Sequence, residues 1–257
     1  MARMRIQRLR ALAQLLFLVL WNVGILPMLK TGLICPVLYC YGCPFAAFAC
    51  PIGVLQNFII SGRLPLYLAG SLGLYGGLVG RAFCGWACPF GALQELLGLA
   101  GGRRLRPTPK WYVKYLFLAL VLLAVWLATD TVFCKLCPAG SLFASIPYRL
   151  ININTPIGLG FYIHLITLVI ALLFFVLAGR VWCSYLCPVA SLLGPTNRLS
   201  LLTIKLDAEK CTKCGICLKN CPMNITKPED IGTSTDCIRC LKCVEECPYK
   251  ALSVDTA

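Results

Sequence analysis

The chain has 257 residues, of which 59% are hydrophobic and only 13% are charged, and its mean hydropathy is +0.79. This composition excludes an ordinary soluble globular protein and is typical of a membrane protein. The formal net charge of +14 does not indicate nucleic-acid binding, because much of the excess lies in short segments beside apolar stretches, where it orients a membrane protein.

Four stretches are apolar enough to cross a hydrocarbon core about 30 Å thick, which takes roughly 20 helical residues. We expect transmembrane spans at residues 11–29, 64–80, 111–129 and 157–178. The second stretch is short and rich in glycine, so we expect it to pack closely against a neighbouring helix.

Basic residues predict the orientation of these spans. They crowd the N-terminal segment and the loop between the second and third spans, namely Arg3, Arg5, Arg8, Arg10, Arg81, Arg103, Arg104, Arg106, Lys110 and Lys114. The opposite loops carry only Lys30, Arg63, Lys135 and Arg149. The positive-inside rule therefore places both termini in the cytoplasm. The basic start resembles a signal peptide, but no convincing small-x-small cleavage site follows it, so we expect a retained first span.

Ten cysteines stand at the ends of the expected spans, and eight of them form an internal repeat. Each half of the chain contains a span, Cys-x2-Cys-Pro, a second span, and Gly-Arg-x2-Cys-x3-Cys-Pro. The repeated pairs are Cys40 and Cys43, Cys84 and Cys88, Cys134 and Cys137, and Cys183 and Cys187. Chance burial of cysteine would not place matched pairs at four successive span ends.

Two halves of the same topology are naturally related by an axis along the membrane normal. We therefore expect an inner and an outer set of four thiolates, the number that a 4Fe–4S cluster requires. The inner set is Cys84, Cys88, Cys183 and Cys187, and the outer set is Cys40, Cys43, Cys134 and Cys137. Proline after each pair suits the first position of a helix, whose positive end favours a thiolate in the preceding cysteine.

Some neighbouring residues allow more than one interpretation. Arg81 and Arg180, each three residues before an inner pair, either bring positive charge to the inner cluster or serve only as cytoplasmic anchors. Cys35 and Cys50 have no counterpart in the second half. They are inert, form a disulfide on the oxidising face, or complete a local set with the first outer pair and leave the second outer pair as a redox-active dithiol.

The last fifty residues carry the most specific pattern in the chain. Cys211-x2-Cys214-x2-Cys217-x3-Cys221-Pro222 recurs with the same spacing at Cys237, Cys240, Cys243 and Cys247-Pro248. In two-cluster bacterial-type ferredoxins with this pattern, the fourth cysteine of each run ligates the other run's cluster. One cluster should take Cys211, Cys214, Cys217 and Cys247, and the other Cys237, Cys240, Cys243 and Cys221. Zinc sites also use Cys-x2-Cys, but two complete copies closed by Cys-Pro argue against zinc.

The predicted fold has two parts. Residues 1–204 should form a membrane all-α domain in which four transmembrane helices make two repeats. Residues 205–257 should form a small α+β ferredoxin domain with two 4Fe–4S clusters. The linker at 194–205 is short, so this domain should lie directly under the inner cysteine set. We expect a multi-pass protein of the cytoplasmic (inner) membrane with its ferredoxin domain in the cytoplasm.

These motifs resemble the membrane polyferredoxins related to NapH, NosR and CcoG. The likeness rests on Cys84-Gly85-Trp86-Ala87-Cys88-Pro89-Phe90-Gly91-Ala92-Leu93-Gln94-Glu95, on Cys183-Ser184-Tyr185-Leu186-Cys187-Pro188 and on the ferredoxin tail, and it spans nearly the whole chain. It implies electron transfer in one of several pathways, which include quinol oxidation for periplasmic reductases, electron supply for metalloenzyme maturation and metal-ion reduction. The extra outer cysteines depart from the simplest family pattern and argue against plain quinol oxidation at the cytoplasmic face.

The leading hypothesis for the function is a transmembrane electron conduit. Single electrons would pass between a cytoplasmic partner and an extracytoplasmic or membrane redox partner through the two ferredoxin clusters and two further clusters in the membrane domain. A membrane roughly 30 Å thick is too wide for one efficient transfer, which gives the outer cysteines a purpose. The chain would then be a non-catalytic electron-transfer subunit of a larger oxidoreductase complex.

Two other functions remain open. A quinol dehydrogenase subunit feeding a reductase would add a quinone to the cofactors. Its candidate residues are His164, inside the fourth span, with Gln94 and Glu95 beside the inner set. A simpler role for His164 is packing against a neighbouring hydroxyl or carbonyl group. The third function is a transmembrane thiol–disulfide relay through the two outer cysteine pairs.

Overall fold

The structure is a computed structural model that describes residues 5–24, 30–102, 105, 107–108, 110–154, 156 and 158–256. Up to residue 198 the described elements are all helical. They are α1 (Arg5–Trp21), α2 (Pro51–Ile60), α3 (Leu66–Val79), α4 (Ala82–Trp86), α5 (Pro89–Ala100), α6 (Trp111–Ala128), α7 (Val132–Leu136), α8 (Pro138–Gly140), the π-helix η3 (Ser141–Ser145), α9 (Ile146–Ile151), α10 (Leu159–Ala178), α11 (Val181–Tyr185), α12 (Pro188–Leu193) and the 3-10 helix η4 (Pro195–Arg198).

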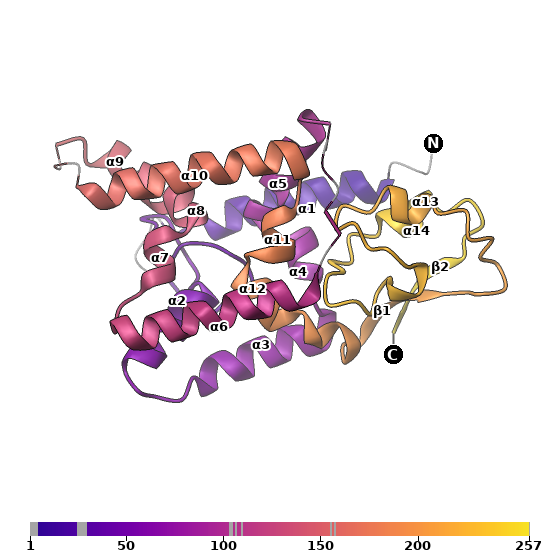
Figure 1. Ribbon diagram of the computed structural model, residues 1–257, viewed down its shortest axis with the longest axis horizontal. Helices are drawn as coiled ribbons and strands as arrows, with labels where there is room; N and C mark the ends of the chain where they lie inside the picture. Colours follow the sequence, from indigo (N-terminus) through magenta and orange to yellow (C-terminus); the bar gives the residue numbers. More distant parts are fainter. Residues whose placement is uncertain are drawn as a thin grey trace.

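Two of the described helices, α6 and α10, are long and apolar enough to cross a membrane. They have 18 and 20 residues and mean hydropathies of 2.0 and 2.6, and only 11% and 22% of their apolar windows are buried inside the protein. Such exposure is unlike that of a core helix in a soluble protein. Figure 1 shows α1, α3, α6 and α10 running roughly along the long axis of the molecule.

The other two expected spans are shorter helices. α1 has 17 residues and begins at Arg5, and α3 has 14 residues. Residues 25–29 of the first expected span lie outside the described residues. Both helices expose large apolar side chains, a surface that lipid would cover, including Leu12, Leu15, Leu16, Leu66 and Leu74. A domain with four transmembrane helices therefore stays a prediction.

Three basic residues of the positive-inside pattern are not loop charges. Arg10, Arg81 and Lys114 are buried and ion-paired, Arg10 with Glu95 and the other two with Asp236. They therefore neutralise buried carboxylates, and the carboxylate that Arg81 and Lys114 share belongs to the C-terminal part of the chain. Four other members of the pattern, Arg3, Arg103, Arg104 and Arg106, lie outside the described residues. The predicted orientation rests on the remainder.

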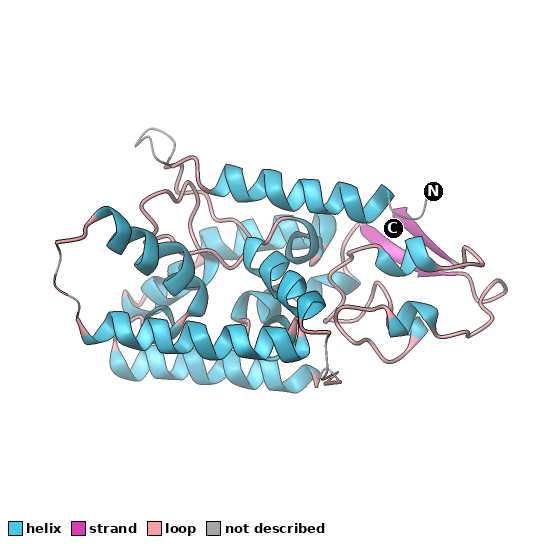
Figure 2. Cartoon of the chain, turned by 90° about the horizontal axis from the view of Figure 1, so that it is seen from above, coloured by secondary structure: helices cyan, strands magenta, loops and turns pink. Residues whose placement is uncertain are grey.

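The C-terminal part is a small ferredoxin-like unit. Strand β1 (Leu202–Leu206) pairs antiparallel with β2 (Leu252–Thr256), with Leu202 opposite Thr256 and Leu206 opposite Leu252. Between them lie α13 (Ile216–Lys219), the 3-10 helix η5 (Pro228–Asp230) and α14 (Lys242–Glu246). The expected domain boundary at 204/205 falls inside β1. Figure 2 shows this unit at one end of the molecule, beside the N-terminal end of α1.

Candidate metal centres

The first ferredoxin set of cysteines surrounds one small cavity. Its lining includes all four predicted members, Cys211, Cys214, Cys217 and Cys247, and its empty volume is about 380 Å³. The chain curls around the cavity because Lys213 and Gly215 adopt left-handed φ angles of 55° and 73°. Cys214 is exposed, so this cavity lies next to solvent.

The second ferredoxin set lies deeper. Burial raises the pKa of the Cys221 thiol to about 12, and the nearby thiols of Cys240 and Cys237 add to the rise. Burial and the thiols of Cys221, Cys237 and Cys240 likewise raise the pKa of Cys243. A buried thiol of this kind gives up its proton when a metal binds. The four cysteines therefore share one buried neighbourhood, with Cys237 and Cys240 on its membrane-domain side.

The second ferredoxin set packs directly on the inner set of the membrane domain. α4 carries Cys84 and Gly85, and a Cβ atom at Gly85 would lie only 2.4 Å from the carbonyl oxygen of Ile238 and 3.7 Å from the Cα atom of Cys240. The indole Nε1 of Trp86 donates to the carbonyl oxygen of Arg239 at 2.9 Å. The backbones of the two cysteine-bearing segments therefore pack directly against each other, because Gly85 has no side chain to separate them.

The four cysteines of the predicted inner set lie near one another. Cys84, Cys88, Cys183 and Cys187 are each only 5–6% exposed, and the thiols of the first three act electrostatically on Cys187. Cys88 and Cys187 immediately precede Pro89 and Pro188, which begin α5 and α12. Each of these cysteines is therefore the N-cap residue of a helix, where backbone amides point at its side chain.

Arg81 and Arg180 each hold the backbone of a cysteine in the other half of the chain. Arg180 donates from Nη1 to the carbonyl oxygen of Cys84 at 2.9 Å, and Arg81 donates from Nη2 to that of Cys183 at 3.4 Å. Both arginines are at most 1% exposed, so neither lies at a lipid–water surface. The Nε atoms of Arg81 and Arg239 are buried with no hydrogen-bond acceptor among the described residues. Buried N–H donors without an acceptor, on side chains that carry positive charge, fit an anionic cluster nearby.

The outer cysteines surround a second cavity, but with one change from the predicted set. The cavity has an empty volume of about 310 Å³, and the cysteines among its lining residues are Cys40, Cys50, Cys134 and Cys137. Cys43 is not among them. The cavity does not bring together Cys35, Cys40, Cys43 and Cys50, the local alternative for the outer set. It joins two cysteines from each half of the chain instead.

The inner and outer sets are close neighbours in the interior. The backbone amide of Leu38 lies within hydrogen-bonding reach of the Cys88 thiol in the inner set. The backbone amide of the next residue, Tyr39, lies within the same reach of the Cys50 thiol at the outer cavity. Because consecutive Cα atoms are 3.80 Å apart, the two thiols lie on the order of 10 Å from each other. Along the long axis of Figure 1, the ferredoxin unit is followed by α4 and α11 and then by α2, α7 and α8.

The arrangement of the thiols fits iron–sulfur clusters. Among the described residues, no three His, Cys, Asp or Glu side chains converge on a point that suits a single metal ion. Tetrahedral zinc needs such a point, about 2.3 Å from each sulfur. A 4Fe–4S cluster instead offers a different iron to each of four thiolates, so its ligands surround a space. The cavities among four cysteines have that form.

The sequence matches two family models over most of its length. One is described as a 4Fe-4S binding domain and matches residues 66–108, 114–152 and 161–206, and the other is a 4Fe-4S dicluster domain at residues 203–248. The putative electron transport protein YccM of Escherichia coli is 33% identical over 218 residues, which cover 77% of this chain and 60% of YccM.

Two ferredoxin-type proteins match shorter regions. NapH of Haemophilus influenzae is 33% identical over 99 residues, which cover 35% of this chain and 34% of NapH. The methylamine utilization protein MauN of Paracoccus denitrificans is 36% identical over 66 residues, which cover 25% of this chain and 22% of MauN. The chain belongs to the NapH-like polyferredoxin family. As a member of this family the chain carries 4Fe–4S binding domains, and two of its described helices are long and apolar enough to cross a membrane.

The chain spans 60% of the length of YccM and about a third or less of NapH and MauN. No solved structure matches it. The number of clusters, their ligands and the partners therefore rest on the geometry of this polyferredoxin itself.

Polar residues beside the cysteines have defined hydrogen-bond and ion-pair partners. Gln94 donates from Nε2 to the Cys183 sulfur at 3.3 Å, and Glu95 pairs with Arg10 and Arg180. His164 shares a 2.8 Å hydrogen bond between Nδ1 and the hydroxyl of Ser145, as expected for a packing histidine.

Sequence reasoning missed Gln56, whose Nε2 donates to the Cys134 sulfur at 3.2 Å. The repeated sequence around Gln56 and Gln94 could have revealed it.

Proposed function

We propose that this polyferredoxin carries single electrons between a cytoplasmic partner and the extracytoplasmic side of the membrane. A 4Fe–4S cluster bound at each of the four cysteine sets would supply one-electron exchange without proton or group transfer. The chain's contribution is to hold the four sites in a row and to keep the two inner ones away from water. The protein environment of each cluster would set its potential, and the direction of flow would follow from these potentials and those of the partners.

The contact between the ferredoxin unit and α4 is the observation that carries this proposal. An electron carrier that only shuttled in solution would not need its second cysteine set wedged against Gly85 and Trp86. The adjacent amides of Leu38 and Tyr39 support the next step, from the inner to the outer set. The second ferredoxin set, the inner set and the outer set therefore lie next to one another in that order.

The first test is a count of clusters in anaerobically purified protein. We expect iron and sulfide for four 4Fe–4S clusters per chain, with matching spin counts in electron paramagnetic resonance (EPR) spectra of the reduced protein. Two clusters would leave only the ferredoxin and would rule out the conduit. Three clusters would rule out a cluster at the outer cysteine site.

We place the chain as a subunit of a larger redox complex in the cytoplasmic membrane, with both termini and the ferredoxin unit in the cytoplasm. The exposed first ferredoxin site would receive or deliver electrons there. NapH and MauN are named as ferredoxin-type proteins, and MauN belongs to methylamine utilization, which favours a role as an electron-transfer component. A catalytic role is not part of the proposal.

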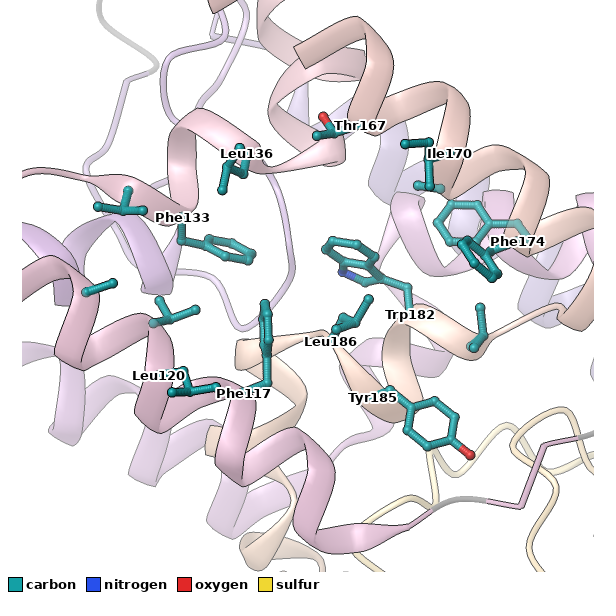
Figure 3. A pocket seen from close by; sticks show the side chains of 16 residues that line it. Phe117, Leu120, Phe133, Leu136, Thr167, Ile170, Phe174, Trp182, Tyr185 and Leu186 are labelled. Atoms are coloured by element: carbon teal, nitrogen blue, oxygen red, sulfur yellow. The ribbon is translucent and has the colours of Figure 1, made fainter. Parts of the chain in front are cut away.

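A quinol-oxidising role has one specific observation in its favour. A cavity of about 580 Å³ lies between α6 and α10, and its lining includes Phe133 and Trp182, the neighbours in sequence of Cys134 and Cys183. Figure 3 shows these two rings facing the cavity together with Phe117. The Nε1 atom of Trp182 is buried without a hydrogen-bond acceptor among the described residues, so a quinone oxygen would satisfy it. The described lining contains no carboxylate, histidine or lysine to take a proton.

Reduction of the clusters by a quinol in proteoliposomes separates this second function from the conduit. If quinol oxidation is the function, quinol alone should reduce the inner cluster, and Trp182→Phe should weaken the reaction by about tenfold, which corresponds to the loss of one hydrogen bond of roughly 1.4 kcal/mol. The conduit predicts no quinol-dependent reduction. Phe174→Leu, which changes the lining without removing a polar group, is the matched control.

A further inference from the structure

The cavity between the two halves of the chain selects four of the six outer cysteines. Its lining brings Cys40 and Cys50 from the first half against Cys134 and Cys137 from the second. The family model begins only at residue 66, so it assigns nothing to Cys40 or Cys50.

The sequence after Cys50 repeats the sequence after Cys88. Cys50-Pro51-Ile52-Gly53-Val54-Leu55-Gln56 and Cys88-Pro89-Phe90-Gly91-Ala92-Leu93-Gln94 share cysteine, proline, glycine, leucine and glutamine at matching positions. Both segments begin a helix with proline and have the cysteine as N-cap, at φ −73° and ψ 126° for Cys50 and φ −79° and ψ 112° for Cys88. Cys50 is therefore the structural counterpart of an inner-set cysteine.

The two matching glutamines make the same unusual contact. Gln56 and Gln94 are both 0% exposed, and each donates from Nε2 to a cysteine sulfur in the other half of the chain. The distances are 3.2 Å from Gln56 to Cys134 and 3.3 Å from Gln94 to Cys183. Two buried amides aimed at two thiols, 78 and 89 residues away in sequence, mark the outer set as a second copy of the inner one.

Cys43 has a different environment. Its sulfur accepts hydrogen bonds from the amide of Phe45 at 3.4 Å and from the hydroxyl of Tyr39 at 3.6 Å. No helix follows Cys43-Pro44, so no helix N-terminus points at its thiol. Cys43 therefore shapes the loop that carries Cys40 and lies outside the cavity.

We propose that Cys40, Cys50, Cys134 and Cys137 hold a 4Fe–4S cluster, with Gln56 as a positioning residue that hydrogen bonds to one of its thiolates. This assignment rests on the proposed electron conduit and gives its outer site a ligand set. A hydrogen bond to a ligating sulfur stabilises the more negative, reduced state of a cluster and so raises its reduction potential. Gln56 and Gln94 tune the outer and inner sites in the same way.

The experiment compares Cys50→Ala and Cys43→Ala in the full chain, purified anaerobically. Cys43→Ala should keep four clusters, whereas Cys50→Ala should keep three and retain the EPR signals of both ferredoxin clusters and the inner cluster. Loss of the fourth cluster in Cys43→Ala, or its retention in Cys50→Ala, overturns the assignment and leaves the conduit standing. A wild-type protein with three clusters overturns both.

A second variant tests the site without removing a ligand. In a potentiometric EPR titration, Gln56→Leu should lower the potential of the outer cluster alone, and Gln94→Leu that of the inner cluster alone. Comparing the two variants shows which EPR signal belongs to the outer cluster and which to the inner cluster. Equal potentials in Gln56→Leu and wild type, or a shift of the inner signal in its place, would contradict the role assigned to Gln56.

Discussion

Replacing Gly85 by alanine should disconnect the ferredoxin unit from the inner cysteine site while leaving every cluster in place. The added Cβ atom would lie 2.4 Å from the carbonyl oxygen of Ile238, which is backbone and cannot turn away. Overpacking of this kind costs about 1–3 kcal/mol, which lowers the equilibrium constant for docking roughly 5- to 150-fold. Electron transfer from the photoreduced ferredoxin clusters to the inner cluster should slow accordingly, as followed by rapid-freeze EPR.

The matched control is Gly73→Ala in α3. A Cβ atom at Gly73 would meet no atom within 4 Å, so this variant makes the same chemical change without a clash. It should transfer electrons at the wild-type rate. Trp86→Phe provides an intermediate case, because it removes only the hydrogen bond to the carbonyl oxygen of Arg239. A wild-type rate in Gly85→Ala would show that the contact at α4 does not carry the electron.

The sequence is informative about the inner site because the pattern that places its cysteines is local. A cysteine directly before a proline that begins a helix is expected at the N-cap position, which places Cys88 and Cys187. The internal repeat indicates that two such Cys-Pro segments face each other. The outer site was harder, because Cys43-Pro44 has the same spacing as Cys137-Pro138. Spacing cannot tell that Cys50, seven residues later, begins the helix. The longer repeat that runs to Gln56 carried that information, and a comparison limited to cysteines overlooks it.

Charge patterns give only part of the role of a basic residue, for a different reason. Counting basic residues treats Arg10, Arg81 and Lys114 as loop charges, yet each pairs with a carboxylate that is distant in sequence. Lys114 lies 2.6 Å from Asp236, a residue of the ferredoxin unit 122 positions later. The sequence alone also does not show why position 85 requires glycine, because the reason is the close approach of the Ile238 backbone on the other side of the contact. Tertiary partners decide these roles.

Glu95→Gln should destabilise the membrane domain more than any other single charge removal that we expect the fold to tolerate. The Glu95 carboxylate is 14% exposed and lies between Arg10 and Arg180, which are 4% and 0% exposed. Glutamine keeps the shape but leaves two buried guanidinium groups uncompensated. Breaking a buried pair in this way costs about 3–5 kcal/mol. In a protein of this size that corresponds to a fall of roughly 10 °C in the melting temperature, measured by circular dichroism in detergent.

The exposed pair of Asp130 and Lys135 supplies the control. Both side chains are about half exposed or more, and water screens their interaction. Asp130→Asn should therefore leave the melting temperature unchanged. An equal change in the two variants would contradict the role assigned to Glu95, because it would show that loss of any carboxylate is enough.

The pH dependence gives the Glu95 prediction a second, independent readout. Burial alone would raise the pKa of Glu95, but the guanidinium groups of Arg180 and Arg10 outweigh burial and hold it at about 2, below the ordinary value of 4.5. Because the folded-state pKa is the lower one, the stabilisation is complete above about pH 4.5 and is lost as the pH falls toward 2. The difference in melting temperature between wild type and Glu95→Gln should stay constant from pH 8 to pH 5 and begin to shrink only below pH 4.5. A difference that grows on acidification would mean that Glu95 is protonated in the folded protein, so that no carboxylate charge compensates Arg10 and Arg180.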